Sequence, residues 1–343
     1  MRKFFAAIGN PPYNDEFGIT GNNEAYAPPV YHNFIDAACE IADKVELIHP
    51  ARFLFNAGRT PKNWNDKMLN DPHFKIMEYI EDATSVFGNT DIKGGVAITY
   101  HDASKDFGAI QVFTKFPELN SILHKTPVTP EMLPSLFYVQ TKFNLDALYK
   151  DHPDYAAFIG SNGSDKRFRS NSFTKVPVFF DEAEGPDDVR VLGVINNKRC
   201  FKYIAKNYVD VSQPNLYKWT AVIPTASGTG TYGEVITAPV VLSPGEGYTQ
   251  TFIGVGAFDT EGSAESMSKY LKAKYVRALM GLYKTTQHIT PEVFCRVPLQ
   301  DFTSASDIDW SRSIAEIDQQ LYKKYGLTDE EIQFIETHVK EMN

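Results

Sequence analysis

The feature that most constrains the fold is a rigid corner near the start of the chain, formed by Asn10, Pro11, Pro12 and Tyr13. It follows an apolar run, residues 3–8, which predicts a short buried β-strand. Because proline fixes φ and has no N–H, the two prolines cannot continue a strand ladder. We therefore expect the corner at the carboxyl end of a strand, where open α/β sheets place their ligands.

The corner suits the recognition of an exocyclic amino group on a flat heterocycle. The side-chain oxygen of Asn10 and the backbone carbonyl of Pro11 can each accept one amino hydrogen. Two such acceptors aim the nitrogen lone pair at an electrophile, and Tyr13 can stack on the ring. Positioning and electrostatics would then supply the rate. A Pro-Pro pair alone is more often an ordinary turn, but the four-residue sequence after an apolar strand favours catalysis.

The motif Asn10-Pro11-Pro12-Tyr13 resembles the catalytic signature of DNA methyltransferases that modify amino groups, chiefly adenine N6. Most of the chain resembles the adenine-specific enzymes of restriction–modification systems. The resemblance implies that these four residues are catalytic, that S-adenosylmethionine is the methyl donor and that double-stranded DNA is the substrate. It also implies that the target base is flipped out of the duplex. The choice between adenine and cytosine amino groups stays open.

A second aromatic residue follows from the same resemblance. The block over residues 83–100 is similar to one in which an aromatic side chain packs on the flipped base, opposite the catalytic tyrosine. Phe87 is then the second half of a sandwich around the base; the alternative is a hydrophobic loop anchor. The polar loop at residues 14–30 either closes over a substrate or is a surface connection. Hydrophobic periodicity predicts helices near 31–42, 63–70 and 265–283, two helices in the tail, and strands at 44–49, 74–79, 96–100, 220–224 and 235–242. In the first helix, Phe34, Ile35, Ala38 and Cys39 form one apolar face, and Thr328 and Glu331 predict a capping box at the start of the last helix.

Composition places the chain among cytoplasmic globular proteins. Hydrophobic residues make up 43% of its 343 residues, which supports a proper core. No apolar run approaches the roughly 18 residues of a membrane helix, and no secretory signal is evident. The three cysteines are far apart and form no metal-ligand pair, so we expect no metal site. The net charge of −9 means that any DNA contact must come from local cationic patches.

The predicted fold class is α/β. We expect a partial Rossmann-like methyltransferase sheet in a catalytic-loop half at residues 1–125. A mixed α/β target-recognition domain is expected at 126–300, and a helical segment at 301–343. Three prolines in residues 122–135 mark the first boundary.

Basic loops in the second region suggest DNA contacts. Two clusters stand out in the sequence, Lys166, Arg167 and Arg169, and Lys198 with Arg199. Such side chains can contact phosphates and base edges. For each cluster alone, a solvated loop is the simpler interpretation. Both clusters lie in the second domain of a chain that resembles DNA methyltransferases, and this location favours DNA binding.

The glycine-rich turn that holds the methyl donor in the family has no clear counterpart. In the family it precedes the catalytic loop, which begins here at Asn10. Residues 226–230 and 254–258 carry short glycine patterns, but both match weakly. We therefore expect a split enzyme or a fragment, with a separate donor-binding half. The alternative is a non-catalytic DNA-recognition subunit. A nuclease motif is not evident, although a nuclease subunit is a possible partner.

Overall fold

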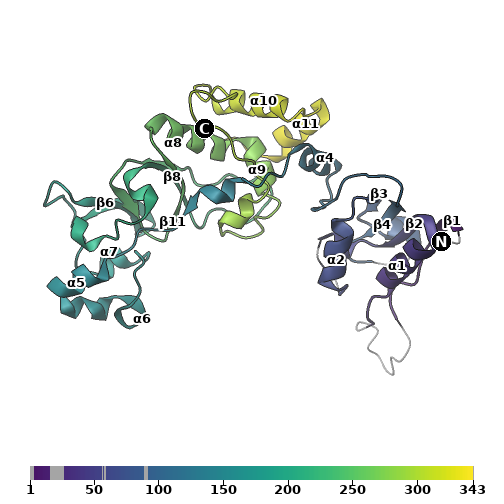
Figure 1. Cartoon of the computed structure of the whole chain (residues 1–343), viewed down its shortest axis with the longest axis horizontal. Coiled ribbons are helices and arrows are strands. Elements are labelled where there is room, and N and C mark those ends of the chain that lie inside the picture. Colours follow the sequence, from purple (N-terminus) through teal and green to yellow (C-terminus); the bar gives the residue numbers. More distant parts are fainter. Residues whose placement is uncertain (1–3, 16–26, 56, 58, 89–91, 343) are drawn as a thin grey trace. The chain divides into compact units, whose positions relative to one another are not determined.

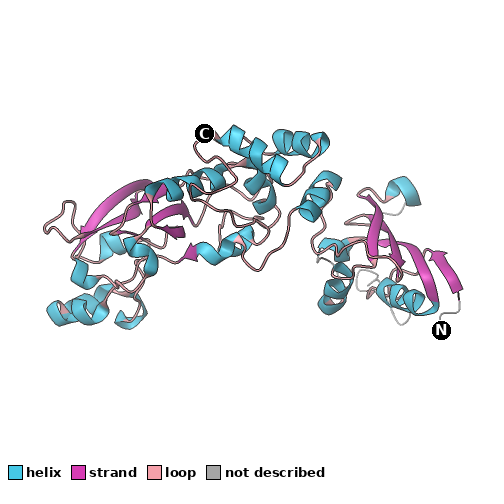
Figure 2. Cartoon of the chain, turned by 45° about the horizontal axis from the view of Figure 1, so that its top comes forward, coloured by secondary structure: helices cyan, strands magenta, loops and turns pink. Residues whose placement is uncertain are grey.

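The computed structural model describes residues 4–15, 27–55, 57, 59–88 and 92–342. The chain folds as two compact units, Met1–His124 and Lys125–Asn343, whose elements are labelled in Figure 1. Each unit combines helices with strands, so the fold is mixed α/β (Figure 2). Within the described ranges, no helix has the length and apolar character needed to cross a membrane.

The first unit is built on a four-stranded mixed sheet with the strand order β1-β2-β4-β3. β1 runs parallel to β2, whereas β4 runs antiparallel to both β2 and β3. The helix α1 follows β1 and leads into β2, as a parallel connection requires. The elements are β1 (Phe4–Gly9), α1 (Tyr31–Ile41), β2 (Ala42–Pro50), η2 (Arg52–Phe55), α2 (Lys62–Leu69), β3 (Phe74–Ile80), α3 (Thr84–Phe87), β4 (Val96–Asp102) and α4 (Pro117–Lys125).

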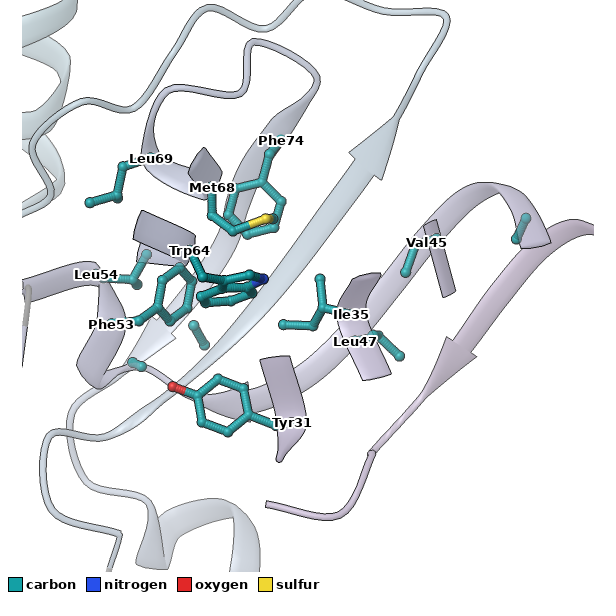
Figure 3. Packing of buried hydrophobic residues seen from close by; sticks show 13 residues of the cluster. Tyr31, Ile35, Val45, Leu47, Phe53, Leu54, Trp64, Met68, Leu69 and Phe74 are labelled. Atoms are coloured by element: carbon teal, nitrogen blue, oxygen red, sulfur yellow. The ribbon is translucent and has the colours of Figure 1, made fainter. Parts of the chain in front are cut away.

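An aromatic core fills the space between this sheet and its helices (Figure 3). Tyr31 and Ile35 lie one helical turn apart on α1 and are both buried, at 3% and 2% exposed. The rings of Phe53 and Trp64 meet edge to face, with centroids 5.1 Å apart. These contacts fix α1 and α2 against the sheet and thereby hold the loops at the strand ends.

The prediction that the first strand is buried is wrong. Phe5 and Ile8 are 72% and 79% exposed, and Phe4 is 55% exposed. The reason is topological, because β1 lies at the edge of the sheet and its strand partner is β2. Its sequence is nevertheless apolar on both faces, which is typical of a strand that lies between two neighbours in a parallel sheet.

The second unit contains two further sheets, β10-β6-β7 and β5-β11-β8-β9, together with the C-terminal helices. Residues 301–343 lie within this unit. Its strands are β5 (Phe137–Tyr138), β6 (Val189–Ile195), β7 (Lys198–Ile204), β8 (Trp219–Pro224), β9 (Val240–Leu242), β10 (Glu246–Tyr248) and β11 (Phe252–Phe258). Its helices are α5 (Leu145–Asp151), α6 (Gly160–Gly163), α7 (Ser172–Lys175), α8 (Glu261–Lys272), α9 (Lys274–Met280), α10 (Ile314–Lys324) and α11 (Asp329–His338), with the 3-10 turns η3 (Leu133–Leu136), η4 (Pro153–Phe158), η5 (Lys206–Tyr208), η6 (Pro214–Tyr217) and η7 (Pro291–Phe294).

Two sequence predictions for this unit need correction, and one is confirmed. The helix expected at 265–283 is broken at Ala273, because the Asp318 carboxylate accepts the first N–H groups of α9 at 3.0 Å. The strand expected at 235–242 is limited to β9. The predicted capping box of α11 is confirmed, since Thr328 and Glu331 satisfy each other's backbone N–H groups.

The buried imidazole of His49 predicts a pH-dependent stability of the first unit. Its ring is fully buried and stacks on Tyr31, and burial lowers the pKa of His49 from 6.5 to about 4. The folded state therefore favours the neutral ring, and this contribution is complete above pH 6.5 and lost as the pH falls toward 4. The protection factors of the β2 amides, which correct for the intrinsic pH dependence of exchange, should fall as the pH is lowered through that interval, and His49→Gln should flatten the response. A profile that is the same for both proteins would contradict this assignment.

Candidate functional site

The Asn-Pro-Pro-Tyr corner lies where β1 ends, as the sequence predicts. Gly9 is the last paired residue of the strand, opposite Leu47 of β2. The Val30 N–H donates to the Tyr13 carbonyl at 2.9 Å, and the Asp15 N–H donates to the Pro28 carbonyl at 2.9 Å. These bonds fasten both ends of the loop predicted at residues 14–30. Residues 16–26, which make up most of that loop, lie outside the described residues.

The corner lines an open cleft of about 890 Å³. Asn10 is exposed there, so its amide is accessible from the cleft. The helix α1 supplies a second wall through Asn33 and Phe34, neither of which the sequence identified as a site residue. The described residues that line the cleft are Asn10, Pro11, Pro12, Tyr13, Asn14, Asp15, Val30, Asn33 and Phe34.

Phe34 corrects the helical pattern expected from the sequence. Its spacing from Ile35 and Ala38 predicted a core-facing position, but its side chain is 45% exposed. Tyr31 and Ile35 define the buried side of α1, and Phe34 lies on the flank of that face. The sequence signal for Phe34 as a cleft residue would have been its aromatic side chain at the side of the buried helix face, next to the loop that follows a strand.

The structure brings Tyr13 and Phe87 together. Their ring centroids are 6.3 Å apart with an interplanar angle of 77°, an edge-to-face contact. Phe87 ends the short helix α3, whose first turn is held by Asp82, because the Asp82 carboxylate accepts from the Thr84 N–H at 3.0 Å. Two rings in this contact leave no room for a third between them. A sandwich around a base would therefore require Tyr13 or Phe87 to turn.

The hydroxyl of Tyr13 is buried and makes no hydrogen bond of standard geometry within the described residues. Burial raises the pKa of Tyr13, and hydrogen bonding with the Asn10 side chain opposes this shift. A buried polar group without a partner costs free energy, and such groups cluster where a ligand completes the bonding. The hydroxyl is therefore a polar group that a bound molecule could satisfy.

The first basic cluster is partly neutralised within the second unit. The guanidinium of Arg167 binds both oxygens of Asp165, at 2.8 and 2.9 Å, and Arg169 Nε lies 2.9 Å from the same carboxylate. Hydrogen bonding to Arg167 lowers the pKa of Asp165 to about 2, so the carboxylate stays charged at neutral pH. Lys166 is exposed, and no ion pair involving its ammonium is found among the described residues.

The second basic cluster lies at the tip of the β6–β7 hairpin. Asn196 and Asn197 both have positive φ, which makes a tight two-residue turn, and Lys198 follows it. Lys198 is exposed. Arg199 instead donates to the Ala238 carbonyl at 2.7 Å, and burial lowers the pKa of Arg199.

Residue 168, within the first cluster's loop, and Arg199 of the second cluster approach residues 250–252 at the start of β11. The carbonyl of Phe168, between Arg167 and Arg169, accepts from the Gln250 N–H at 2.7 Å. The guanidinium of Arg199 lies 5.7 Å from the centroid of the Phe252 ring. Residues 166–169 and 198–199 therefore flank one segment of the second unit, although they are about 30 positions apart in sequence.

Neither glycine pattern forms an open cradle for a methyl donor. In residues 226–230, the N–H groups of Thr229 and Gly230 donate to the Glu234 carboxylate at 2.7 and 2.8 Å. Glu234 also pairs with the buried Lys284, so the turn is filled by the chain itself. Residues 254–258 belong to the strand β11 rather than to a strand-to-helix turn. The described residues thus show no donor cradle at either place.

Comparison with known proteins relates the first part of the chain to a family. Residues 1–87 match the model of the Eco57I restriction-modification methylase family, a segment that contains the corner and ends at Phe87. Over this segment, about a quarter of the chain, the match supports a methylase of restriction–modification systems. A comparison with curated proteins returned no match.

A solved structure that resembles the chain is the ATP-dependent Type ISP restriction-modification enzyme LlaBIII bound to DNA. The sequence identity is 10%, the TM-score is 0.24, and the match covers 85% of this chain. The chain spans only 29% of that structure's length. At this TM-score the likeness supports no conclusion about the fold or the activity.

The unsatisfied hydroxyl predicts that Tyr13→Phe stabilises the unliganded first unit. The change removes a buried polar group that lacks a hydrogen bond of standard geometry, which should gain about 1 kcal/mol. The matched control is Tyr248→Phe, because the Tyr248 hydroxyl is buried and donates to backbone carbonyls at 2.9 and 3.0 Å. That change should destabilise the second unit. Urea denaturation followed by hydrogen exchange in each unit measures both effects, and a loss of stability in Tyr13→Phe would contradict the assignment.

Proposed function

We propose that the chain is the catalytic-loop and target-recognition portion of a site-specific DNA methyltransferase of a restriction–modification system. The reaction is methylation of adenine N6 on a base flipped out of the duplex, which costs a few kcal/mol of unstacking. The observation that carries the proposal is the Asn-Pro-Pro-Tyr corner, held at the carboxyl end of β1 and facing a cleft. The match of residues 1–87 to a restriction-modification methylase family supports it.

The corner's chemistry is that of an amino-group clamp. Pro11 and Pro12 leave the strand ladder, so the Pro11 carbonyl has no strand partner to which it is committed. Asn10 Oδ1 and this carbonyl each accept one hydrogen of the amino group, which directs the nitrogen lone pair toward the methyl group. Tyr13 and Phe87 hold the base from its two faces after one ring has turned out of the edge-to-face contact.

The sheet of the first unit supports the proposal. In this sheet β1 and β2 are parallel, and the antiparallel β4 lies between β2 and β3. This order is compatible with half of a Rossmann-like methyltransferase sheet. S-adenosylmethionine would supply the methyl group, but the glycine patterns of this chain do not fit it, because one is filled by Glu234 and the other is a strand. We therefore assign donor binding to a separate half.

A second candidate function is a DNA-recognition subunit without catalytic activity. The glycine turn filled by Glu234 favours it, since a chain that cannot hold a methyl donor cannot transfer a methyl group by itself. Calorimetric titration of the purified chain with S-adenosylmethionine, alone and together with a donor-binding half, separates the two functions. Donor binding only in the mixture supports the split enzyme, and no donor binding in either case supports the recognition subunit.

Loss of the Asn10 amide should abolish methylation in the complete assembly. Asn10→Ala removes one of the two acceptors for the amino group, and removal of one such group typically slows an enzyme by about 100-fold or more. Asn10→Asp keeps an acceptor oxygen and should retain part of the rate. Incorporation of labelled methyl groups into mixed-sequence DNA measures both variants. Wild-type activity in Asn10→Ala would remove the proposed role of this residue.

The exposed lysines of the two basic clusters should carry the salt-dependent part of DNA binding. Replacing Lys166 or Lys198 by alanine should weaken binding and reduce the slope of log affinity against log salt by about one for each phosphate that the variant no longer binds. Lys218→Ala is the matched control, because it makes the same charge change in a lysine already paired with Asp259. Equal effects of all three substitutions would contradict specific contacts at the clusters.

A further inference from the structure

The pairing of Arg167 with Asp165 is not explained by a general attraction of the basic clusters for DNA. The guanidinium binds both oxygens of the Asp165 carboxylate, through Nε at 2.8 Å and through Nη2 at 2.9 Å. The Asp165 side chain is only 5% exposed, whereas the Arg167 side chain is 49% exposed. A partly exposed ion pair contributes little to stability, but a bidentate pair fixes the orientation of a guanidinium.

The Asp165 carboxylate faces two guanidinium groups. Arg169 Nε lies 2.9 Å from the same carboxylate, so the three side chains together keep one positive charge. Lys166, which is exposed, adds a second positive charge to the loop. The loop therefore still attracts an anionic ligand such as DNA, and the carboxylate orients its arginines without cancelling their charge.

The guanidinium of Arg167 keeps one complete edge for a ligand. An arginine offers five N–H donors in a planar fork. Asp165 takes the edge made by Nε and Nη2, and no hydrogen bond from Nη1 is found within the described residues. One donor on Nη1 and one on Nη2 remain side by side. Such a pair matches two neighbouring acceptors on a rigid ligand.

The backbone that carries Arg167 is firmly held. Arg167 pairs with Lys142 in an isolated antiparallel bridge. The next residue, Phe168, is fully buried, and its ring centroid lies 4.4 Å from that of Phe143. The side chain of Arg167 is therefore fixed at one end by the backbone and at the other end by Asp165.

A strained turn positions the carboxylate. Ser161 and Asn162 have positive φ values of 56° and 53°, a conformation that costs free energy in residues other than glycine. The Asp165 N–H closes the turn by donating to the Gly160 carbonyl at 3.0 Å. Strained backbone of this kind clusters at functional sites, where the surrounding structure holds it in place. Here the turn sets the position of Asp165 and thereby the orientation of Arg167.

We propose that Arg167 determines specificity by reading a guanine in the major groove, an inference that rests on the DNA-binding function proposed above. Guanine presents O6 and N7 there as two adjacent acceptors, and a bidentate arginine is the commonest specific contact to them. The open Nη1–Nη2 edge of Arg167 supplies the two matching donors. Asp165 is a positioning residue, because it acts on the DNA only through Arg167.

A phosphate contact is the alternative use of the same edge. A phosphate requires positive charge and tolerates a flexible side chain, and the exposed Lys166 already offers this in the same loop. A guanidinium that is fixed in one orientation gains most from two acceptors at fixed positions, as on a base edge. The pairing with Asp165 therefore favours base reading by Arg167 and leaves phosphate binding to Lys166.

Selection of the full chain on a pool of DNA duplexes with randomised positions tests the inference. The bound DNA is sequenced, and fluorescence anisotropy then measures affinity for single-base variants of the selected site at several salt concentrations. We expect the wild-type chain to require guanine at one position. Arg167→Lys keeps the charge but loses the fork. It should reduce the preference for that guanine by at least about tenfold and leave the salt dependence unchanged.

Asp165→Asn separates base reading from charge attraction. The change removes a negative charge, so a phosphate-binding Arg167 would bind every sequence more tightly, whereas a base-reading Arg167 loses its orientation and with it guanine preference. Hydrogen exchange at residues 164–168 reports whether the loop stays folded, and Arg167→Lys carries the test if it does not. Arg312→Lys is the matched control, because Arg312 is also exposed and its Nε lies 3.0 Å from Asp309. It should leave the base preference unchanged.

Four outcomes would overturn the inference. They are no base preference in the wild-type chain, a guanine preference that survives Arg167→Lys, an Arg167-dependent preference for another base, and equal weakening on all sequences by Arg167→Lys. Failure of the proposed methyltransferase function is distinguishable from these. An Arg167-dependent guanine preference without methyl transfer in the complete assembly keeps the reading role and contradicts catalysis. Methylation whose guanine requirement is unaffected by Arg167→Lys keeps the function and removes the role of Arg167.

Discussion

Parallel pairing of β1 with β2 is the interaction on which the candidate site depends. It fixes the point at which the chain leaves the sheet, and the two prolines then hold the corner in one direction. The Tyr13 carbonyl is fastened to Val30, at the entrance to α1, and α1 is anchored in the aromatic core by Tyr31 and Ile35. Packing of the aromatic core thereby fixes the position of the loop that carries Asn10.

The same pairing leaves one backbone edge of β1 without a strand partner among the described residues. The strand is apolar along its length, and Phe5 and Ile8 are largely exposed. In the second unit, neither glycine pattern is open to a ligand, because Glu234 fills one and the other belongs to β11.

Local chemistry made some features predictable from the sequence. The proline corner, the strand before it and the capping box of α11 each depend on residues close together in the chain. Features set by distant residues were not predictable. The exposure of Phe5 depends on what lies beside β1, the break at Ala273 depends on Asp318, and the ion pairs of Arg167 and Arg169 with Asp165 require the fold of a loop. The proximity of Phe87 to Tyr13 was predicted from the family resemblance and not from the hydrophobic pattern of the sequence.

The proposed mechanism requires the corner to present two oxygens to one amino group of an unstacked base. Its most direct test is the identity of the modified nucleoside after mixed-sequence DNA is incubated with this chain, a donor-binding half and S-adenosylmethionine. Digestion and mass spectrometry should find N6-methyldeoxyadenosine. N4-methyldeoxycytidine would keep the clamp but change the base. Methylation at a ring carbon, as in 5-methyldeoxycytidine, would contradict the account, because no amino group takes part in that reaction.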